Sequence, residues 1–181
     1  MEKFDLIVLG GGAGAFAASI AANERGAKTA MVNAGLPLGG TCVNVGCVPS
    51  KTLLKIGEIA YYGNYGFDAI SGKLEVDFEK AIKHELGLVD KMRHDKYTGV
   101  LSNLGNVTRF EGKAKFVSKN EVEVNGKKLY GEKFVIATGS IALPLSIEGI
   151  DKVDYITHID ALKLKKLPKS MVVIGAGPVG L

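Results

Sequence analysis

The stretch FDLIVLGGGAGA, residues 4–15, carries a short apolar run straight into a glycine-rich turn. Apolar residues 4–9 are typical of a strand buried on both faces of a parallel sheet. The turn follows the pattern G-x-G-x-x-A, in which Gly10 permits a tight turn, Gly12 permits close approach of a pyrophosphate, and Ala15 permits close packing of a helix. A strand, such a turn and a helix in succession favour a dinucleotide site over an ordinary glycine-rich turn.

A helix and a second strand complete this first unit. We expect the helix to end near Arg25, where Gly26 provides a stop signal, and residues 28–32 predict the second strand. The helix N-terminus offers unpaired N–H groups and the positive end of its dipole to an anion. Asn33 ends the second strand, where this fold usually has an acid for the ribose hydroxyls. An amide hydrogen-bonds but carries no charge, so we expect weaker ribose binding there.

The stretch GGTCVNVGCVPSK, residues 39–51, contains both cysteines of the chain. A disulfide needs Cα atoms about 4.4–6.8 Å apart, whereas positions i and i+5 of a regular α-helix are farther apart. A Cys42–Cys47 bridge therefore requires a departure from helix, which Asn44 and Gly46 tolerate. So small a loop constrains the unfolded chain little, and redox chemistry is a better use for the pair than structural cross-linking.

The other interpretations of the cysteines are an inert buried pair and a structural metal site. They could be buried and inert, as cysteines of intracellular proteins often are. A structural zinc site would need four ligands, and the three histidines form no ligand-spaced pair with either cysteine; they are His84, His94 and His158. We therefore predict no structural metal.

Composition narrows the class of protein. The chain has 181 residues, of which 46% are hydrophobic and 23% charged, and a net charge of +4, a balance typical of globular proteins. No basic stripe with interleaved aromatics supports nucleic-acid binding. Residues 6–22 are apolar, but glycines interrupt them and they fall short of the roughly 20 residues of a membrane span. We expect a cytoplasmic protein without a membrane partner, in which a disulfide would be catalytic or regulatory.

The remaining elements follow from periodicity and turn signals. Helices are expected at 50–62 and about 76–104, and strands at 114–117, 121–124, 127–130 and 133–137. Thr138, Gly139 and Ser140 end the last of these strands, and small polar residues there suit a ligand crossing the carboxyl ends of a parallel sheet. Thr157 and Asp160 predict a capped short helix.

A second glycine-rich turn lies at the end of the chain. Residues 170–174 predict a new strand, and GAGPVG, residues 175–180, is a full G-x-G-x-x-G. One strand and a turn cannot complete a dinucleotide fold, so we expect the N-terminal piece of a longer protein.

The predicted fold is α/β and Rossmann-like. Its expected parts are a domain over 1–145 with a parallel sheet, a β-meander and a helical excursion at about 50–105; a connector over 146–168; and the start of a truncated second Rossmann domain over 169–181.

Four features occur in order: the GxGxxA turn, the Cys-x4-Cys stretch, an Ala-Thr-Gly strand end and the second GxGxxG. Together they resemble the pyridine-nucleotide-disulfide oxidoreductase family across the whole chain. Val43, Val48 and Ser50 make the cysteine stretch most similar to the mercuric reductase branch of that family. The resemblance implies FAD in the domain over 1–145 and NADPH or NADH at the turn that begins the second domain.

The same resemblance implies roles for individual residues. Cys42 would be the interchange thiol that faces substrate, and Cys47 the thiol that lies against the flavin. Asn33 would face the adenosine ribose. The residues expected at FAD are Gly10, Gly12, Ala13, Gly14, Ala15, Asn33, Gly40, Thr41, Lys51, Ala114, Thr138, Gly139 and Ser140. Gly175, Gly177 and Gly180 would begin the NADPH or NADH site.

The activity implied for the longer protein is reduction of Hg(II) by NADPH, through FAD and the Cys42/Cys47 pair. Hg(II) is a soft ion suited to thiolate ligands. A dihydrolipoamide dehydrogenase, a glutathione reductase-type enzyme and a non-catalytic FAD-binding redox module remain alternatives. We expect a homodimer for the longer protein, with a small-molecule or metal-ion substrate. We expect the 181-residue chain alone to lack turnover and the family's dimerisation domain.

Overall fold

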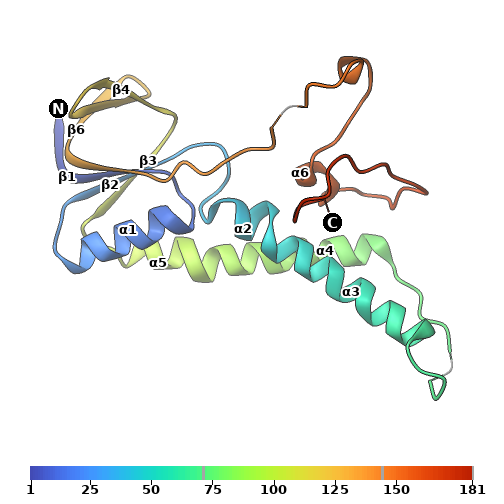
Figure 1. Cartoon of the computed structure of the whole chain (residues 1–181). Helices are drawn as coiled ribbons and strands as arrows, with labels where there is room; N and C mark the ends of the chain where they lie inside the picture. Colours follow the sequence, from blue (N-terminus) through green and yellow to red (C-terminus); the bar gives the residue numbers. More distant parts are fainter. Residues whose placement is uncertain (71, 144, 181) are drawn as a thin grey trace. The chain divides into compact units, whose positions relative to one another are not determined.

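The computed structural model describes residues 1–70, 72–143 and 145–180; Ser71, Pro144 and Leu181 lie outside the described residues. The chain divides into two compact units. The first unit comprises Met1–Asn44 and Asp90–Ser140, and the second comprises Val45–Val89 and Ile141–Leu181. Figure 1 labels most of the helices and strands of the two units.

A six-stranded sheet forms the first unit, in the order β3-β2-β1-β6-β5-β4 (Figure 1). The strands are β1 (Glu2–Leu9), β2 (Thr29–Asn33), β3 (Val107–Glu111), β4 (Ala114–Ser118), β5 (Glu121–Val124) and β6 (Lys127–Ile136). β3, β2, β1 and β6 are parallel, and β4 and β5 continue the sheet antiparallel. The predicted α/β fold with a parallel sheet and a β-meander is confirmed.

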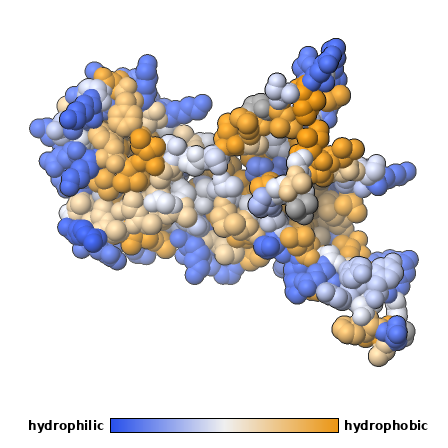
Figure 2. All heavy atoms as spheres, viewed as in Figure 1, coloured by the Kyte–Doolittle hydropathy of each residue, from blue (hydrophilic) through white to orange (hydrophobic). Residues whose placement is uncertain are grey.

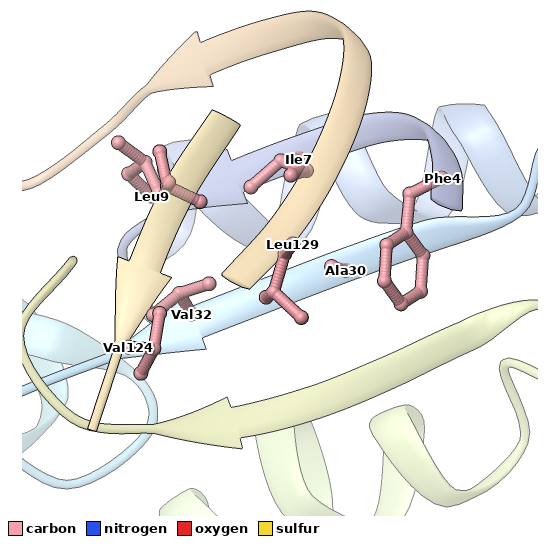
Figure 3. Close-up of a cluster of buried hydrophobic side chains, with 8 residues drawn as sticks. Phe4, Ile7, Leu9, Ala30, Val32, Val124 and Leu129 are labelled. Carbon is pink, nitrogen blue, oxygen red and sulfur yellow. The ribbon is translucent and has the colours of Figure 1, made fainter. Parts of the chain in front are cut away.

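Figure 3 shows the apolar core on one face of this sheet. The Glu-Val-Glu-Val sequence of β5 buries its two valines, because successive side chains of a strand point to opposite faces. The meander thereby covers the apolar residues of β1 and β2. The cluster comprises Phe4, Ile7, Leu9, Ala30, Val32, Val122, Val124 and Leu129.

Helices cover the other face of the sheet. α1 (Ala13–Glu24), the π-helical turn η1 (His94–Thr98) and α5 (Gly99–Ser102) contribute to this layer. Phe16 of α1 packs with Met31 and Leu38 in a second cluster. The Phe16 ring meets Tyr97 edge-on, with centroids 4.9 Å apart, which is a preferred aromatic arrangement. Both faces of β2 and of the second half of β1 are therefore covered, as the apolar sequences there require.

The second unit contains α3 (Cys47–Tyr65), most of α4 (Phe78–Arg93), η2 (Ile150–Lys152) and α6 (His158–Ala161). Thr157 and Asp160 form the predicted capping box of α6. Figure 2 shows apolar atoms at the surface over the segment that follows residue 140. Ile141, Leu143 and Val172 are more than 80% exposed. Among the residues the structure describes, no helix is long and apolar enough to cross a membrane.

Four details differ from the sequence-based expectations. The strands expected at 127–130 and 133–137 form one continuous strand, β6. β3 was not predicted, and residues 170–174 were wrongly predicted to be a strand. A strand needs a neighbour for its N–H and C=O groups, and none pairs with 170–174 within the described part of the chain. The single helix expected over 76–104 is interrupted by the π-helical turn η1. Within α4, Ile82 and Val89 are buried, whereas Leu86 is 44% exposed.

Candidate cofactor and redox site

The carboxyl ends of the four parallel strands meet at one edge of the sheet. Gly10 N–H donates to the carbonyl of Val32 at 2.7 Å, and Ala137 N–H donates to that of Leu9 at 2.8 Å. Gly112 N–H donates to the carbonyl of Asn33 at 2.8 Å, which adds the end of β3. In open α/β sheets, ligands bind outside the carboxyl ends of the strands. The candidate site is therefore this edge.

Gly10 makes the turn out of β1 possible. Its φ is +134°, a conformation that L side chains rarely adopt. A Cβ at this position would lie closer than 3.0 Å to the carbonyl carbon and oxygen of Ala137. The glycine is therefore required both by the turn and by the passage of the β6 end beside it.

The GxGxxA turn and the turn before Cys42 lie directly against each other. Gly39 N–H donates to the carbonyl of Gly11 at 2.7 Å, and Gly12 forms a parallel bridge with Gly39. Gly40 has φ of +62°, and a Cβ there would be 2.8 Å from Gly12 Cα. Only glycine permits this approach. α2 (Gly40–Val45) thus begins beside the first turn, and Cys42 lies in it with its side chain exposed.

The N-terminus of α1 is open to an anion. Its N-cap, Gly12, has no side-chain cap, and its first turn contains no acid. Ala13 and Gly14 are exposed, whereas Ala15 is fully buried against the sheet. The first-turn N–H groups of a helix have no intrahelical acceptor and favour negative charge. These residues fit a pyrophosphate, as the sequence pattern predicts.

Asn33 is buried beneath the glycine turn, with only 6% of its surface exposed. A Cβ on Gly11 would clash with its amide oxygen. Its Nδ2 donates to the Leu36 carbonyl at 3.1 Å and to Oε2 of Glu111 at 3.4 Å. Sequence reasoning missed Glu111 because it missed β3. The available signal was the strand-forming residues Val107, Thr108 and Phe110, which lie between Asn106 and Gly112.

Asn44 holds the turn that precedes Cys42. Its Nδ2 donates to the carbonyls of Pro37, Leu38 and Gly40 at 3.0, 3.2 and 2.8 Å. Its Oδ1 accepts from Nε of Arg93 at 2.7 Å. Asn44 was expected to loosen the backbone between the cysteines, but it lies within α2. The break falls at Gly46, which has φ −136° and ψ −112° and precedes α3.

We predict that Asn44→Ala lowers the free energy of unfolding by about 1–3 kcal/mol, because three carbonyls lose a shared donor. Urea denaturation of the purified chain measures the change. Asn44→Asp is the matched variant: it keeps an acceptor for Arg93 but cannot donate to the carbonyls. Equal losses in both variants would assign the stabilisation to the carbonyl contacts. An Asn44→Ala variant as stable as the unsubstituted chain would refute this role.

The two cysteines lie in different units, Cys42 in the first and Cys47 in the second. Both side chains are exposed, which argues against the buried, inert interpretation. Cys47 is the first residue of the 19-residue α3, where the helix dipole favours negative charge. The Cys42–Cys47 disulfide stays a prediction. No group of three or more His, Cys, Asp or Glu able to hold a metal occurs within residues 1–70, 72–143 and 145–180.

The other expected site residues fall into two sets. Thr138, Gly139 and Ser140 follow β6 after Ala137 and are exposed, and Ala114 begins β4 just beyond the end of β3. Gly139 has φ of +73°, and a Cβ there would meet nothing within 4 Å. Lys51 and the glycines of the second GxGxxG belong to the second unit. Those glycines lie in a turn in which Gly180 N–H donates to the Gly177 carbonyl at 2.9 Å.

Comparison with known proteins identifies the class. The pyridine nucleotide-disulphide oxidoreductase family matches residues 4–181, and the chain belongs to this family. FAD and NAD(P)H are the cofactors of the family. The resemblance to the pyridine-nucleotide-disulfide oxidoreductase family, stated from the sequence, is confirmed.

Individual proteins similar to this chain have more specific names than the family. A mercuric reductase of Lysinibacillus sphaericus is 43% identical over 184 residues, covering 99% of this chain and 33% of the relative. A dihydrolipoyl dehydrogenase of Acholeplasma laidlawii is 33% identical, covering 99% of this chain and 55% of the relative. The structure of the HOCl-induced flavoprotein disulfide reductase RclA from Escherichia coli is similar with a TM-score of 0.77 and 26% identity, covering 91% of this chain and 35% of that one. The chain thus spans about a third of the mercuric reductase it matches.

Proposed function

We propose that this chain forms the FAD-binding part of a mercuric reductase-type enzyme. The overall reaction would convert NADPH and Hg(II) to NADP⁺, a proton and elemental mercury. One observation carries the proposal: the start of α2, the helix that contains Cys42, lies against a glycine turn whose helix N-terminus is open to an anion. The 43% identity to a mercuric reductase supports the substrate class.

The residues of the first unit would bind and orient the cofactor. The exposed first turn of α1 would take the pyrophosphate with its N–H groups, and Thr138, Gly139 and Ser140 would line the same edge. FAD, when bound, supplies a carrier that takes up a hydride and passes on two electrons. Those electrons would convert the Cys42–Cys47 disulfide to a dithiol. Its two thiolates would then bind Hg(II), which prefers soft sulfur ligands.

A dihydrolipoamide dehydrogenase-type enzyme is the second candidate, because relatives with that activity in their name match 99% of the chain. Its substrate is a dithiol rather than a metal ion. An assay of the longer protein separates the two candidates. NADPH oxidation that depends on Hg(II) supports the first proposal, and reduction of a nicotinamide by dihydrolipoamide supports the second.

Binding of FAD tests the cofactor assignment in the chain itself. Purified protein mixed with excess FAD and then desalted should remain yellow, with one flavin per chain at saturation. Ala13→Asp should lower the affinity for FAD by about tenfold or more, because a carboxylate in the first turn of α1 repels the pyrophosphate. The same substitution should not destabilise the protein, since an acid is favourable at a helix N-terminus.

Ala13→Asn is the matched control for shape without charge. It should bind FAD nearly as well as the unsubstituted chain. A folded chain that retains no flavin at saturating FAD would overturn the cofactor assignment. Equal binding by the Asp and Asn variants would place the pyrophosphate elsewhere.

A further inference from the structure

We propose that Glu111 supplies the acidic group for the adenosine ribose of FAD that Asn33 lacks. The proposal deepens the proposed function and rests on FAD binding at the carboxyl edge of the sheet. In dinucleotide folds, a carboxylate near the end of the second strand accepts hydrogen bonds from ribose hydroxyls. This chain has an amide at that position, and β3 places a carboxylate beside it.

Strand pairing puts the two side chains together. Asn33 and Glu111 are direct partners in the parallel register of β2 and β3. Directly opposite residues of neighbouring strands point to the same face of a sheet. The amide Nδ2 lies 3.4 Å from Oε2 of Glu111, and the Asn33 amide oxygen faces the Cα side of Gly11. Asn33 thus connects the glycine turn to the Glu111 carboxylate.

The carboxylate projects from a fixed backbone. Gly112 N–H donates to the Asn33 carbonyl at 2.8 Å, and Nδ2 of Asn125 donates to the backbone carbonyl of Glu111 at 2.8 Å. The guanidinium of Arg109 holds Oε1 of Glu111 through both Nε and Nη2. The position of the acid is therefore set before any ligand arrives.

One oxygen of this carboxylate keeps its capacity for a ligand. Oε1 is engaged by Arg109, whereas Oε2 accepts a long hydrogen bond of 3.4 Å from Asn33. A carboxylate oxygen can accept two hydrogen bonds, and the Glu111 side chain is 52% exposed. Hydrogen bonds from hydroxyls to a carboxylate are charge-assisted and stronger than those to an amide. Asn33 would orient the acid, and Glu111 would take the hydroxyls.

The test measures the binding of two ligands by the unsubstituted chain and by two variants. The ligands are FAD and its analogue with 2′,3′-dideoxyadenosine, and binding is measured by flavin fluorescence. Glu111→Gln should weaken FAD binding by about 10- to 100-fold, the loss expected for hydrogen bonds to a charged group. The affinity for the dideoxy analogue should change less than twofold, because that analogue has no hydroxyl to lose. Glu132→Gln, an exposed carboxylate elsewhere on the same sheet, is the control and should change neither.

A double variant that exchanges the amide of residue 33 and the carboxylate of residue 111 tests whether FAD affinity depends on having one carboxylate at this pair. Asn33→Asp combined with Glu111→Gln keeps one amide and one carboxylate in contact, and should recover most of the FAD affinity lost by Glu111→Gln alone. Equal losses for both ligands, or no loss for FAD, would overturn the assignment while leaving FAD binding intact. Absence of FAD binding in the unsubstituted chain would overturn the proposed function, and the assignment with it.

Discussion

Gly10→Ala is expected to lower the free energy of unfolding by about 2–6 kcal/mol, as the sum of positive-φ strain and overpacking. The φ of +134° is strained for any residue with a Cβ, and the added methyl would clash with the backbone of Ala137. Backbone cannot move aside like the end of a flexible side chain. This loss would be a large fraction of the free energy of unfolding of a typical domain, which is about 5–15 kcal/mol.

Two other glycines separate the causes of this loss. Gly26 has φ of +72°, with nothing within 4 Å of a Cβ, so Gly26→Ala has strain without a clash and should cost about 1–2 kcal/mol. Gly57 lies inside α3 with open space around it, so Gly57→Ala should stabilise by about 0.5–1 kcal/mol. Urea denaturation of the three variants measures the order. A Gly10→Ala loss no larger than that of Gly26→Ala would show that β6 yields at Ala137.

Loss of either cysteine is expected to weaken Hg(II) binding by the reduced chain by about 10²- to 10⁴-fold, the advantage of two linked ligands over one. The chain has only two cysteines, so each single variant leaves one thiol. Cys42→Ser and Cys47→Ser should therefore lose similar amounts of affinity. Competition against a small dithiol of known affinity measures the loss.

The double variant Cys42→Ser with Cys47→Ser is the baseline and should bind Hg(II) only weakly. Thiol titration gives a second readout: the oxidised chain should show no reactive thiol, and the reduced chain two. If each single variant retained the full affinity, the cysteines would bind metal separately and the proposed redox pair would be wrong. Thiols that react fully before reduction would contradict the disulfide.

Local signals in the sequence correctly predicted the first part of the sheet. The strand expected over 4–9 is β1, and the helix expected to end near Arg25 is α1, which ends at Glu24. These signals are local because an apolar run, a glycine turn and a stop glycine each act over a few residues. The meander was predicted for the same reason, from short strand-like segments separated by turn signals.

Elements that depend on a partner were not predictable in this way. Val107–Glu111 has five residues with an arginine at its centre, and it becomes a strand because β2 offers it hydrogen bonds. Residues 170–174 have the stronger apolar pattern but find no such partner in the described chain. Pairing between distant segments decides strand formation in both cases, since a lone strand leaves its backbone groups unsatisfied.

In the candidate site too, some features follow from local sequence patterns and others depend on contacts between distant segments. The sequence alone identified the glycines of the first turn, the cysteine stretch and the missing acid at Asn33, because each is a residue type in a recognisable local pattern. The contact of Gly12 with Gly40 and the pairing of Asn33 with Glu111 come from tertiary structure. Both join segments far apart in the chain, and only the close packing of strand ends at one edge of the sheet brings them within contact distance.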